Sequence, residues 1–464
     1  MMIVREVIER FEKKAPVCVM VRAAMENVLS GERLDGMFEK TAYRQENRRL
    51  MFSTVADIMG LVACKIHPSV HATYQAKKEE VGVTAKALYD KLQRMEGNIS
   101  RQLVRETASR MAEIIRKTGG VLPELVAGYR VKVLDGNHLR RTQRRIGELR
   151  ELNAAPLPGH CAVILDPRLK LAIDVIPCED AYAQERTLLP AVLATVERRD
   201  LWVADRNFCT TDFLFGIKSR GGYFAIRQHS QTLRYELIGR RKRIGRTETG
   251  MVYEQRMRIF DAEGRAMTIR RVTVELDQPT RDGDTEIHIL TNLPKRVTAL
   301  AVADLYRKRW TIEIAFHELA QNLEGEIETL GYPRAALFGF CMALVCYNVL
   351  SVVLASLRAA HGAETIQEKL SFYYLCDEVA ATSRGLSIAL PDEYWSRKYA
   401  NLTPARLARE LVRIAKTVQL DRYRKHKRGP KKPATKMNKK RRNHVSTARV
   451  LKQRHPTREC IHCW

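Results

Sequence analysis

The spacing of apolar residues changes several times along the chain, and each change marks a different kind of predicted structure. From residue 1 to 128 apolar residues recur at helical spacing, with Arg and Lys throughout. We predict helices over residues 4–14, 41–64, 85–95 and 100–118, the last closed by Gly119 and Gly120. This helical region can act as a DNA-binding unit or as a helical cap, and the pattern does not separate the two.

Residues 129–228 alternate short β-prone runs with helical ones. Strands are predicted over 129–139, 161–167, 170–177, 201–208 and 222–228, and helices over 183–198 and 211–219. The order is therefore three strands, helix, strand, helix, strand. Because helices that cross over between strands require parallel pairing, this region predicts a mixed α/β domain.

Residues 229–300 are predicted to be a β-rich insertion, with strand-like segments at 251–260, 267–276 and 285–293. The stretch 305–324 then contains no Gly or Pro and predicts one continuous helix. One stripe of this helix carries the polar side chains Tyr306, Arg309, Glu313, His317 and Glu324. The alternative interpretation of that stripe is the solvated face of an ordinary amphipathic helix.

The run 335–357 has no charged residue over 23 positions, which is long enough for a membrane span. However, it contains Asn348 and Ser351, and it is the only run of its kind. We therefore predict a buried core helix, within a second part of the core at 301–358.

The net charge points to a polyanionic partner. The chain of 464 residues carries 80 Lys and Arg against 53 Asp and Glu, a formal charge of +27. Residues 359–420 look helical, whereas residues 421–464 hold 16 of the basic residues and only two acidic ones, and are predicted to be a disordered tail. The rest of the chain is basic as well, so DNA or RNA is the favoured partner and an anionic membrane surface the weaker alternative.

The ten cysteines lie mostly in apolar segments, which predicts buried thiols in a reducing cytoplasm. The N-terminus is charged almost at once and lacks the apolar stretch of a signal peptide. Cys460, His462 and Cys463, with His455, are zinc-type ligands, but one cluster without a second pair does not carry a zinc prediction.

Two acidic residues stand at the ends of predicted strands. Asp135 ends the first strand of the α/β region and Asp205 ends the fourth, and strand ends converge at one edge of a sheet. A helix packed there can add Glu313. Each Asp taken singly is more often a turn former or a helix cap. Three carboxylates together repel one another unless a cation lies between them, and Mg²⁺ or Mn²⁺ suits oxygen ligands and a substrate phosphate.

At these residues the chain resembles a known family. DGNHL around Asp135, ADRNF around Asp205, and Tyr306, Arg309 and Glu313 resemble the DDE transposases of bacterial insertion sequences. Within them the chain is similar to the branch called the IS-four family, which is marked by Tyr, Arg, Glu and Lys at a fixed spacing on the Glu helix. The β-rich insertion before that helix also matches the branch.

This resemblance implies a ribonuclease H-like catalytic fold, interrupted by the insertion and flanked by helical N-terminal and C-terminal regions. Asp135, Asp205 and Glu313 would bind two Mg²⁺ ions, for which Mn²⁺ can substitute, and Tyr306 and Arg309 would contact the phosphate beside the cut. The implied reaction is cleavage at transposon ends, through a hairpin in relatives, and strand transfer into target DNA. The implied partners are double-stranded DNA, at the terminal inverted repeats and the target, and a second copy of the chain in a homodimer. The implied location is the bacterial cytoplasm at the nucleoid.

The sequence departs from that branch in two ways. Ala320 stands where the signature has Lys, and no Trp lies between Trp202 and Trp310 to hold a flipped base. Tyr253 or Phe260 would have to stack in its place. Two alternatives therefore stay open: a catalytically inactive or repurposed DNA-binding protein, and a nuclease of the same fold that does not rejoin DNA.

A basic patch follows the first Asp motif. It consists of Arg140, Arg141, Arg144 and Arg145. Arginines so close together predict contact with a DNA backbone, with a solvated face as the alternative.

Overall fold

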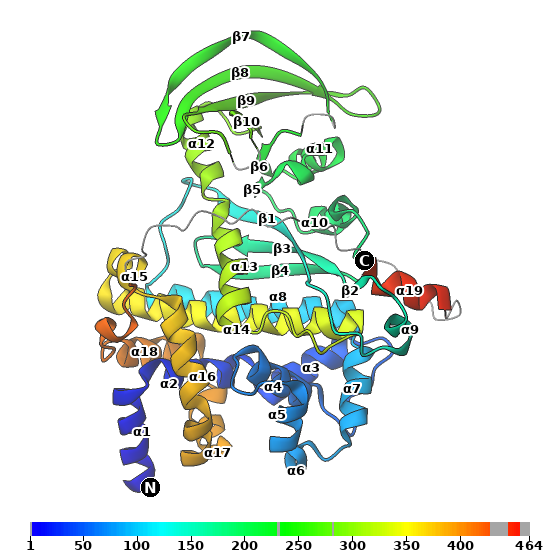
Figure 1. Cartoon of the computed structure of the whole chain (residues 1–464). Coiled ribbons are helices and arrows are strands. Elements are labelled where there is room, and N and C mark those ends of the chain that lie inside the picture. Colours follow the sequence, from blue (N-terminus) through cyan, green and yellow to red (C-terminus); the bar gives the residue numbers. More distant parts are fainter. Residues whose placement is uncertain (1, 230–232, 281–282, 427–443, 455–464) are drawn as a thin grey trace.

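The computed structural model of the chain describes residues 2–229, 233–280, 283–426 and 444–454. Its centre is a mixed sheet of nine strands in the order β4-β3-β1-β5-β6-β10-β9-β8-β7 (Figure 1). The pairs β1–β5 and β5–β6 are parallel and the other neighbours are antiparallel, which confirms the predicted mixed sheet. The strands are β1 Arg130–His138, β3 His160–Asp166, β4 Leu171–Cys178, β5 Asp200–Ala204, β6 Tyr223–Arg227, β7 Arg234–Thr247, β8 Gly250–Phe260, β9 Ala266–Leu276 and β10 Glu286–Thr291.

Successive residues of the central strands point to opposite faces of the sheet, and each face has its own core. Val133 and Val203 belong to a large core, whereas Leu134 and Trp202 belong to a smaller one packed against α10 (Leu189–Leu193) and α11 (Thr211–Ser219). The helix predicted over 183–198 is shorter than expected. It consists of a single 3₁₀ turn, η1 (Glu185–Leu188), and of α10, which begins at Leu189 and has Pro190 in its first turn.

The β-rich insertion is part of the main sheet. β10 pairs with β6, so β9, β8 and β7 continue the same sheet beyond the core strands. β7, which we did not predict, is the edge strand, and almost all of its residues are exposed. Its charged side chains and its two glycines suit an unpaired edge, because they discourage pairing with another chain.

The apolar run predicted as a core helix is α14 (Pro333–His361). It is long and apolar enough to cross a membrane, but 94% of its most apolar window is buried inside the protein, so it is a core helix. Its polar residues are paired: Asn348 exchanges two hydrogen bonds of 2.8 Å with the backbone of Ala172 in β4, and Oγ of Ser351 donates to the carbonyl of Lys170. These bonds fix α14 against the β3–β4 hairpin.

Most of the N-terminal helices lie beneath α14 on the side away from the insertion, and the last of them runs level with α14 and also packs against β4 (Figure 1). They are α1 Met2–Lys14, α2 Pro16–Val28, α3 Gly31–Thr41, α4 Phe52–Ala63, α5 Val70–Ala76, α6 Lys78–Val81, α7 Ala85–Gln93 and α8 Gly97–Thr118. The helix predicted over 41–64 is wrong for residues 42–51, which form a loop. Side chains hold this loop open, because Glu96 accepts the N–H groups of residues 43–45 and Oδ1 of Asn47 accepts that of Phe52.

The C-terminal helices pack into the same large core as the N-terminal ones. They are α15 Ala363–Lys369, α16 Phe372–Ala389, α17 Asp392–Trp395 and α18 Pro404–Ala415, with a π turn at Ser396–Ala400 and a 3₁₀ turn at Leu420–Tyr423. The helical character predicted for residues 359–420 is therefore confirmed.

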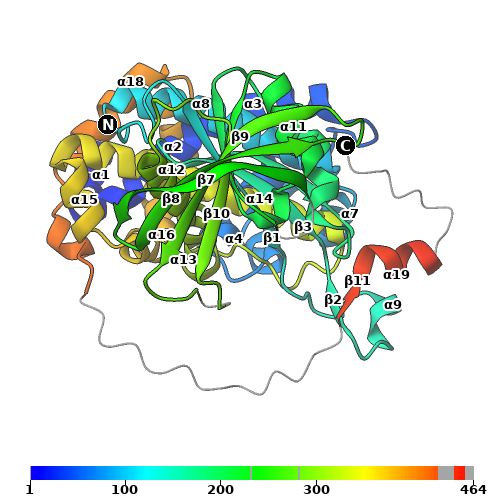
Figure 2. The same ribbon diagram turned by 90° about the horizontal axis from the view of Figure 1, so that it is seen from above.

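The disordered tail was predicted for residues 421–464, of which residues 427–443 and 455–464 lie outside the described residues. The prediction is wrong for residues 421–423, which lie in the 3₁₀ turn Leu420–Tyr423. It is also wrong for residues 444–454. There, β11 (His444–Ser446) pairs with β2 (Ala155–Leu157), and α19 (Thr447–Arg454) packs beside α9 (Gly147–Arg150). Figure 2 shows the four elements together at one side of the molecule. Val450 packs against Ile146 and Leu149. Such a small apolar cluster produces no periodic pattern in the sequence, so it was not predicted. The Cys and His residues at 455–463 lie outside the described residues.

Candidate active site

Asp135 and Asp205 occupy neighbouring positions on two parallel strands. In the β1–β5 pairing Leu134 lies opposite Ala204, so the next residue on each strand is an Asp. Asp205 directly follows β5, as predicted. Asp135 ends only the β1–β5 pairing, because β1 continues to His138 by pairing with β3. Both carboxylates leave the sheet on the face of the large core, since Val133 and Val203 are two residues before them.

The helix that carries the third carboxylate is broken where it reaches the sheet. We predicted one helix over 305–324, but the structure has α12 (Ala299–Arg307) and α13 (Trp310–Asn322). At the break, the N–H groups of Arg309 and Ile312 donate to carbonyls three residues earlier instead of four, which tightens the turn. This turn places Tyr306, Arg309 and Glu313 on consecutive turns facing the two Asp residues.

Arg309 joins two of the carboxylates, and Tyr306 binds the third. Nη1 of Arg309 lies 3.3 Å from Oδ2 of Asp135, and its Nη2 lies 2.6 Å from Oε1 of Glu313. The hydroxyl of Tyr306 donates to Oδ1 of Asp205 at 3.1 Å. These bonds form two sets, and the guanidinium of Arg309, 5.8 Å from the ring centroid of Tyr306, joins them into one group. The five predicted residues come from β1, from the end of β5 and from the junction of α12 and α13.

The electrostatics of this group are dominated by burial. Burial raises the pKa of Asp135 to about 7, against the lowering effect of Arg309, and the charges of Glu313 and Asp205 raise it further. Burial opposes the charge of Arg309, but Tyr306 and the carboxylates together raise its pKa above the usual range. Burial and then Asp205 also raise the pKa of Tyr306. The single positive charge of the guanidinium does not fully compensate three carboxylates, so the site would stabilise a further cation.

The ligand chemistry of the group fits a hard divalent cation, but its present placement does not form a metal site. Within the described ranges no three His, Cys, Asp or Glu side chains lie close enough to hold a metal ion. The reason is that Arg309 lies between Asp135 and Glu313. Nε of Arg309 is buried without a hydrogen-bond partner in the described part of the chain, so this side chain has bonding capacity still unused. A cation that took the three carboxylates would leave the whole guanidinium for an anion.

Sequence reasoning missed a carboxylate on the opposite face of β1. Glu185 in η1 lies against Gly136, where a Cβ would be only 1.9 Å from its Oε1. Its Oε1 is 3.5 Å from Nε2 of His138, and its Oε2 accepts from Nδ2 of Asn207 at 3.4 Å. The hydrogen bond from His138 lowers the pKa of Glu185. Glu185 thus links the residues that follow Asp135 to those that follow Asp205.

Only Gly136 could have hinted at this contact, because a glycine inside a strand often marks a close approach of another group. The next residue of η1, Arg186, strengthens the link: its Nε donates to the carbonyl of Asn207 at 3.1 Å. Two consecutive residues therefore hold the turn after β5 against β1, directly behind the two Asp residues.

The predicted basic patch lies on a loop that leaves the sheet. Arg140, Arg141, Arg144 and Arg145 are all exposed. Their bonds are to the loop itself and to Glu326: the backbone N–H of Arg140 donates to Glu326 at 2.6 Å. Within the described ranges none of the four binds the carboxylates of the candidate site, so any role in DNA contact would be at a distance from it.

The position of the signature Lys is neighboured by a different lysine. Ala320 lies on the last turns of α13, and Nζ of Lys65, from the residue pair after α4, donates to the carbonyl of Gln321 at 2.9 Å. A cation from a distant part of the chain therefore contacts the backbone of the residue after Ala320.

Residues 128–349 match the family model of the transposase DDE domain. The matched range is a little less than half of the chain and contains Asp135, Asp205 and Glu313. The match supports a DDE transposase, and with it DNA binding, transposition and DNA recombination. The mixed sheet with helices on both faces is compatible with the ribonuclease H-like fold expected for such a domain. No curated protein matches the chain.

Proposed function

We propose that the chain is a metal-dependent transposase that cuts the ends of its own element and transfers them into target DNA. The observation that carries this proposal is the juxtaposition of Asp135 and Asp205 on paired parallel strands, with Glu313 joined to Asp135 through Arg309. It occurs inside the range that matches the transposase DDE domain. We assign the chain to the IS-four branch on Tyr306, Arg309 and Glu313, with Ala320 as the departure.

In this proposal Asp135, Asp205 and Glu313 hold two Mg²⁺ ions, or Mn²⁺ in their place. When bound, such ions supply an activated water and stabilise the oxygen that leaves the phosphodiester. The chain's own residues then have separate tasks. Arg309, released from the two carboxylates, grips the phosphate beside the cut with its planar fork, and Tyr306 donates a hydrogen bond next to it.

The route of cleavage is a finer part of the proposal. We favour hydrolysis followed by strand transfer, with a hairpin as the variant. Tyr253 is covered by Arg241, whose guanidinium lies 3.8 Å from the ring centroid, so it is a poor choice for stacking a flipped base. Trp310, next to Arg309, is 63% exposed and is the better candidate for that contact. Lys65 would supply the positive charge that Ala320 lacks.

The test is a nicking assay on DNA that carries the inverted repeats flanking the gene, with Mg²⁺. Asp205→Asn and Glu313→Gln should abolish cleavage and leave DNA binding intact. Asp212→Asn, seven residues from Asp205 and exposed on α11, is the matched control and should cleave normally. Cleavage retained by Asp205→Asn at the wild-type rate would refute the assignment.

A second candidate function is a DNA-binding protein that no longer cuts. It is favoured by the position of Arg309 between two of the carboxylates and by Ala320. Wild-type protein that binds the repeats but never nicks them with Mg²⁺ or Mn²⁺ would support this candidate.

A nuclease that cuts without rejoining would nick the ends but give no joined product in a strand-transfer assay. The homodimer that we expect would be seen as two end-bearing DNAs held in one complex.

A further inference from the structure

A pocket of about 900 Å³ lies where five segments of the chain meet, and it shares no residue with the candidate active site. The segments are the loop after α3, the junction of α7 and α8, the end of β4, the start of α14, and α19. Its charged lining residues are Arg44, Arg94, Arg334, Arg449, Lys452, Glu96, Glu179 and Asp180. Because α19 forms one wall, the C-terminal segment completes the pocket.

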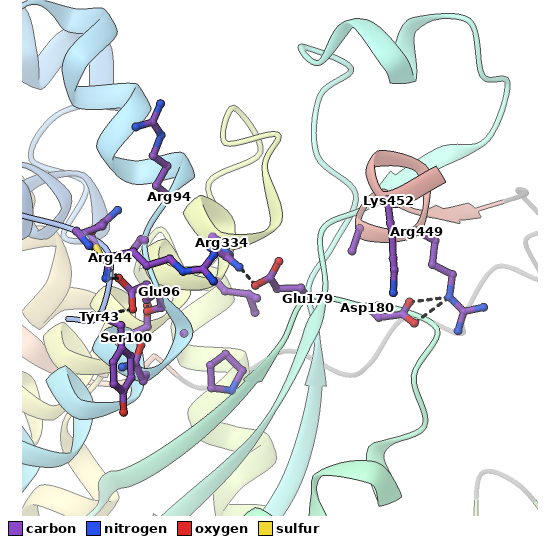
Figure 3. A pocket seen from close by; sticks show the side chains of 17 residues that line it. Tyr43, Arg44, Arg94, Glu96, Ser100, Glu179, Asp180, Arg334, Arg449 and Lys452 are labelled. Carbon is purple, nitrogen blue, oxygen red and sulfur yellow. Dashed lines mark hydrogen bonds and ion pairs between the residues drawn. The ribbon is translucent and has the colours of Figure 1, made fainter. Parts of the chain in front are cut away.

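The acidic residues of the lining are already paired inside the protein. Nε of Arg334 donates to Glu179 at 2.7 Å, and Nε of Arg449 donates to both oxygens of Asp180 at 2.8 and 3.0 Å (Figure 3). Glu96 is held by the backbone N–H groups of the loop after α3. The acidic groups therefore do not make the pocket suitable for a cation.

The remaining positive charge faces an open space. Figure 3 shows Arg94 on one side of the pocket and Lys452 on the other, with the Arg334–Glu179 pair between them. Both Arg94 and Lys452 are exposed, and neither forms an ion pair or a side-chain hydrogen bond with any described residue. Cations on two opposing walls, with their acidic neighbours neutralised, suit a polyanion that runs between them.

The basic lining also continues beyond the pocket. Ile146 and Leu149 pack against Val450 of α19, so the loop that carries Arg141, Arg144 and Arg145 adjoins that helix. All of these arginines are exposed. A small anion would need only one such cluster, whereas a track of cations along several elements matches the repeated phosphates of a nucleic acid backbone.

We propose that this pocket and the loop beside α19 form a second DNA-binding surface, which grips the backbone of duplex DNA outside the catalytic site. The identity of the partner rests on the proposed function. The surface contributes affinity without sequence preference, because its contacts are to phosphates. The segment of β11 and α19 works here as a strap: the pairing of β11 with β2, and the bonds of Ser446 and Arg449 to Asp180, hold Lys452 opposite Arg94.

The experiment measures binding of the full chain to a fluorescent duplex DNA of arbitrary sequence, by anisotropy in EDTA, over a range of salt. Arg94→Glu/Lys452→Glu is compared with Arg10→Glu/Lys13→Glu on α1, which makes the same change of charge at exposed positions on another part of the molecule. Each phosphate contact contributes roughly 0.9 to the slope of log affinity against log salt. Losing two contacts should therefore lower that slope by about 2 and weaken binding by roughly 60-fold at ~0.1 M salt.

The matched control on α1 should change both quantities much less. Equal losses in the two double variants would overturn the proposal, because only net charge would then matter. Arg94→Gln/Lys452→Gln, which removes the same two contacts without adding negative charge, should also weaken binding by roughly 60-fold at ~0.1 M salt, and wild-type behaviour in it would also overturn the proposal. Displacement of the DNA by duplex RNA at equal concentration would reassign the surface to RNA. Failure of the proposed function would appear instead as wild-type protein that does not cleave, whatever the result of this comparison.

Discussion

Gly136→Ala tests the contact between the two Asp motifs most directly. The new Cβ would lie 1.9 Å from Oε1 of Glu185 and 2.5 Å from its Cδ, whereas ordinary contacts are longer than about 3.4 Å. The carboxylate must therefore move by more than about 1 Å, which takes it away from Asn207 and His138. Because the displaced atoms are the end of a flexible side chain, we expect a modest loss of about 1–2 kcal/mol, near the lower end of overpacking costs.

The effect on cleavage should be larger than the effect on stability. Glu185 ties the turn after Asp205 to the strand that carries Asp135, and a shift of about 1 Å in a reacting group can cost about 100-fold in rate. Stability would be measured by urea denaturation, and activity by single-turnover nicking of element ends. The stability measurement does not require cleavage activity, so its outcome is independent of the proposed function.

A double-mutant cycle provides the decisive comparison. In a Glu185→Ala background the steric conflict is gone, so adding Gly136→Ala should cost less than about 0.5 kcal/mol. An interaction energy of at least about 1 kcal/mol between the two changes is therefore expected. If Gly136→Ala costs the same in both backgrounds, the contact does not govern this site and the reasoning is wrong. Gly264→Ala, at a turn with positive φ and no atoms near its would-be Cβ, separates backbone strain from steric conflict.

Three further predictions concern single residues. Arg309→Ala should lower the free energy of unfolding by about 2–4 kcal/mol at neutral pH, which is less than for a fully buried ion pair because the Glu313 side chain is 47% exposed. Mg²⁺ should restore part of that stability, and an equal loss with and without Mg²⁺ would contradict the metal assignment. The pKa of Asp135 is about 7 in the folded protein instead of the ordinary 3.8, so folding favours its protonated form. The stability that Asp135 contributes is therefore complete below about pH 4 and is lost as the pH rises through about 7. The urea midpoint should therefore fall between about pH 5 and pH 8 in the wild type and fall less in Asp135→Asn; identical profiles would refute this. Asn348→Leu should cost about 2–5 kcal/mol by leaving both backbone groups of Ala172 unpaired in the core, and a loss below about 1 kcal/mol in thermal or urea denaturation would show that those groups find other partners.

Local patterns in the sequence determined much of this protein. Alternating and helical periodicities are properties of neighbouring residues, so they predicted the strands around Asp135 and Asp205, the helices of the N-terminal region and the buried helix of α14. The same logic identified Tyr306, Arg309 and Glu313, because residues three and four apart share one side of a helix. Strand ends and the helix face proposed these five side chains together with His317 and Glu324, and the resemblance to the DDE transposases selected the five as one candidate site.

Tertiary structure decided what these patterns could not contain. The helix at 305–324 is broken at Arg309, where the guanidinium binds Asp135 from a distant part of the chain as well as Glu313, four residues further along. β10 pairs with β6, so the insertion extends the core sheet. Glu185 contacts Gly136, and the segment 444–454 docks on α9 and β2, through single contacts between residues far apart in sequence. Such contacts leave no periodic trace, because pairing across a sheet and packing of a short apolar patch depend on partners that the local sequence does not name.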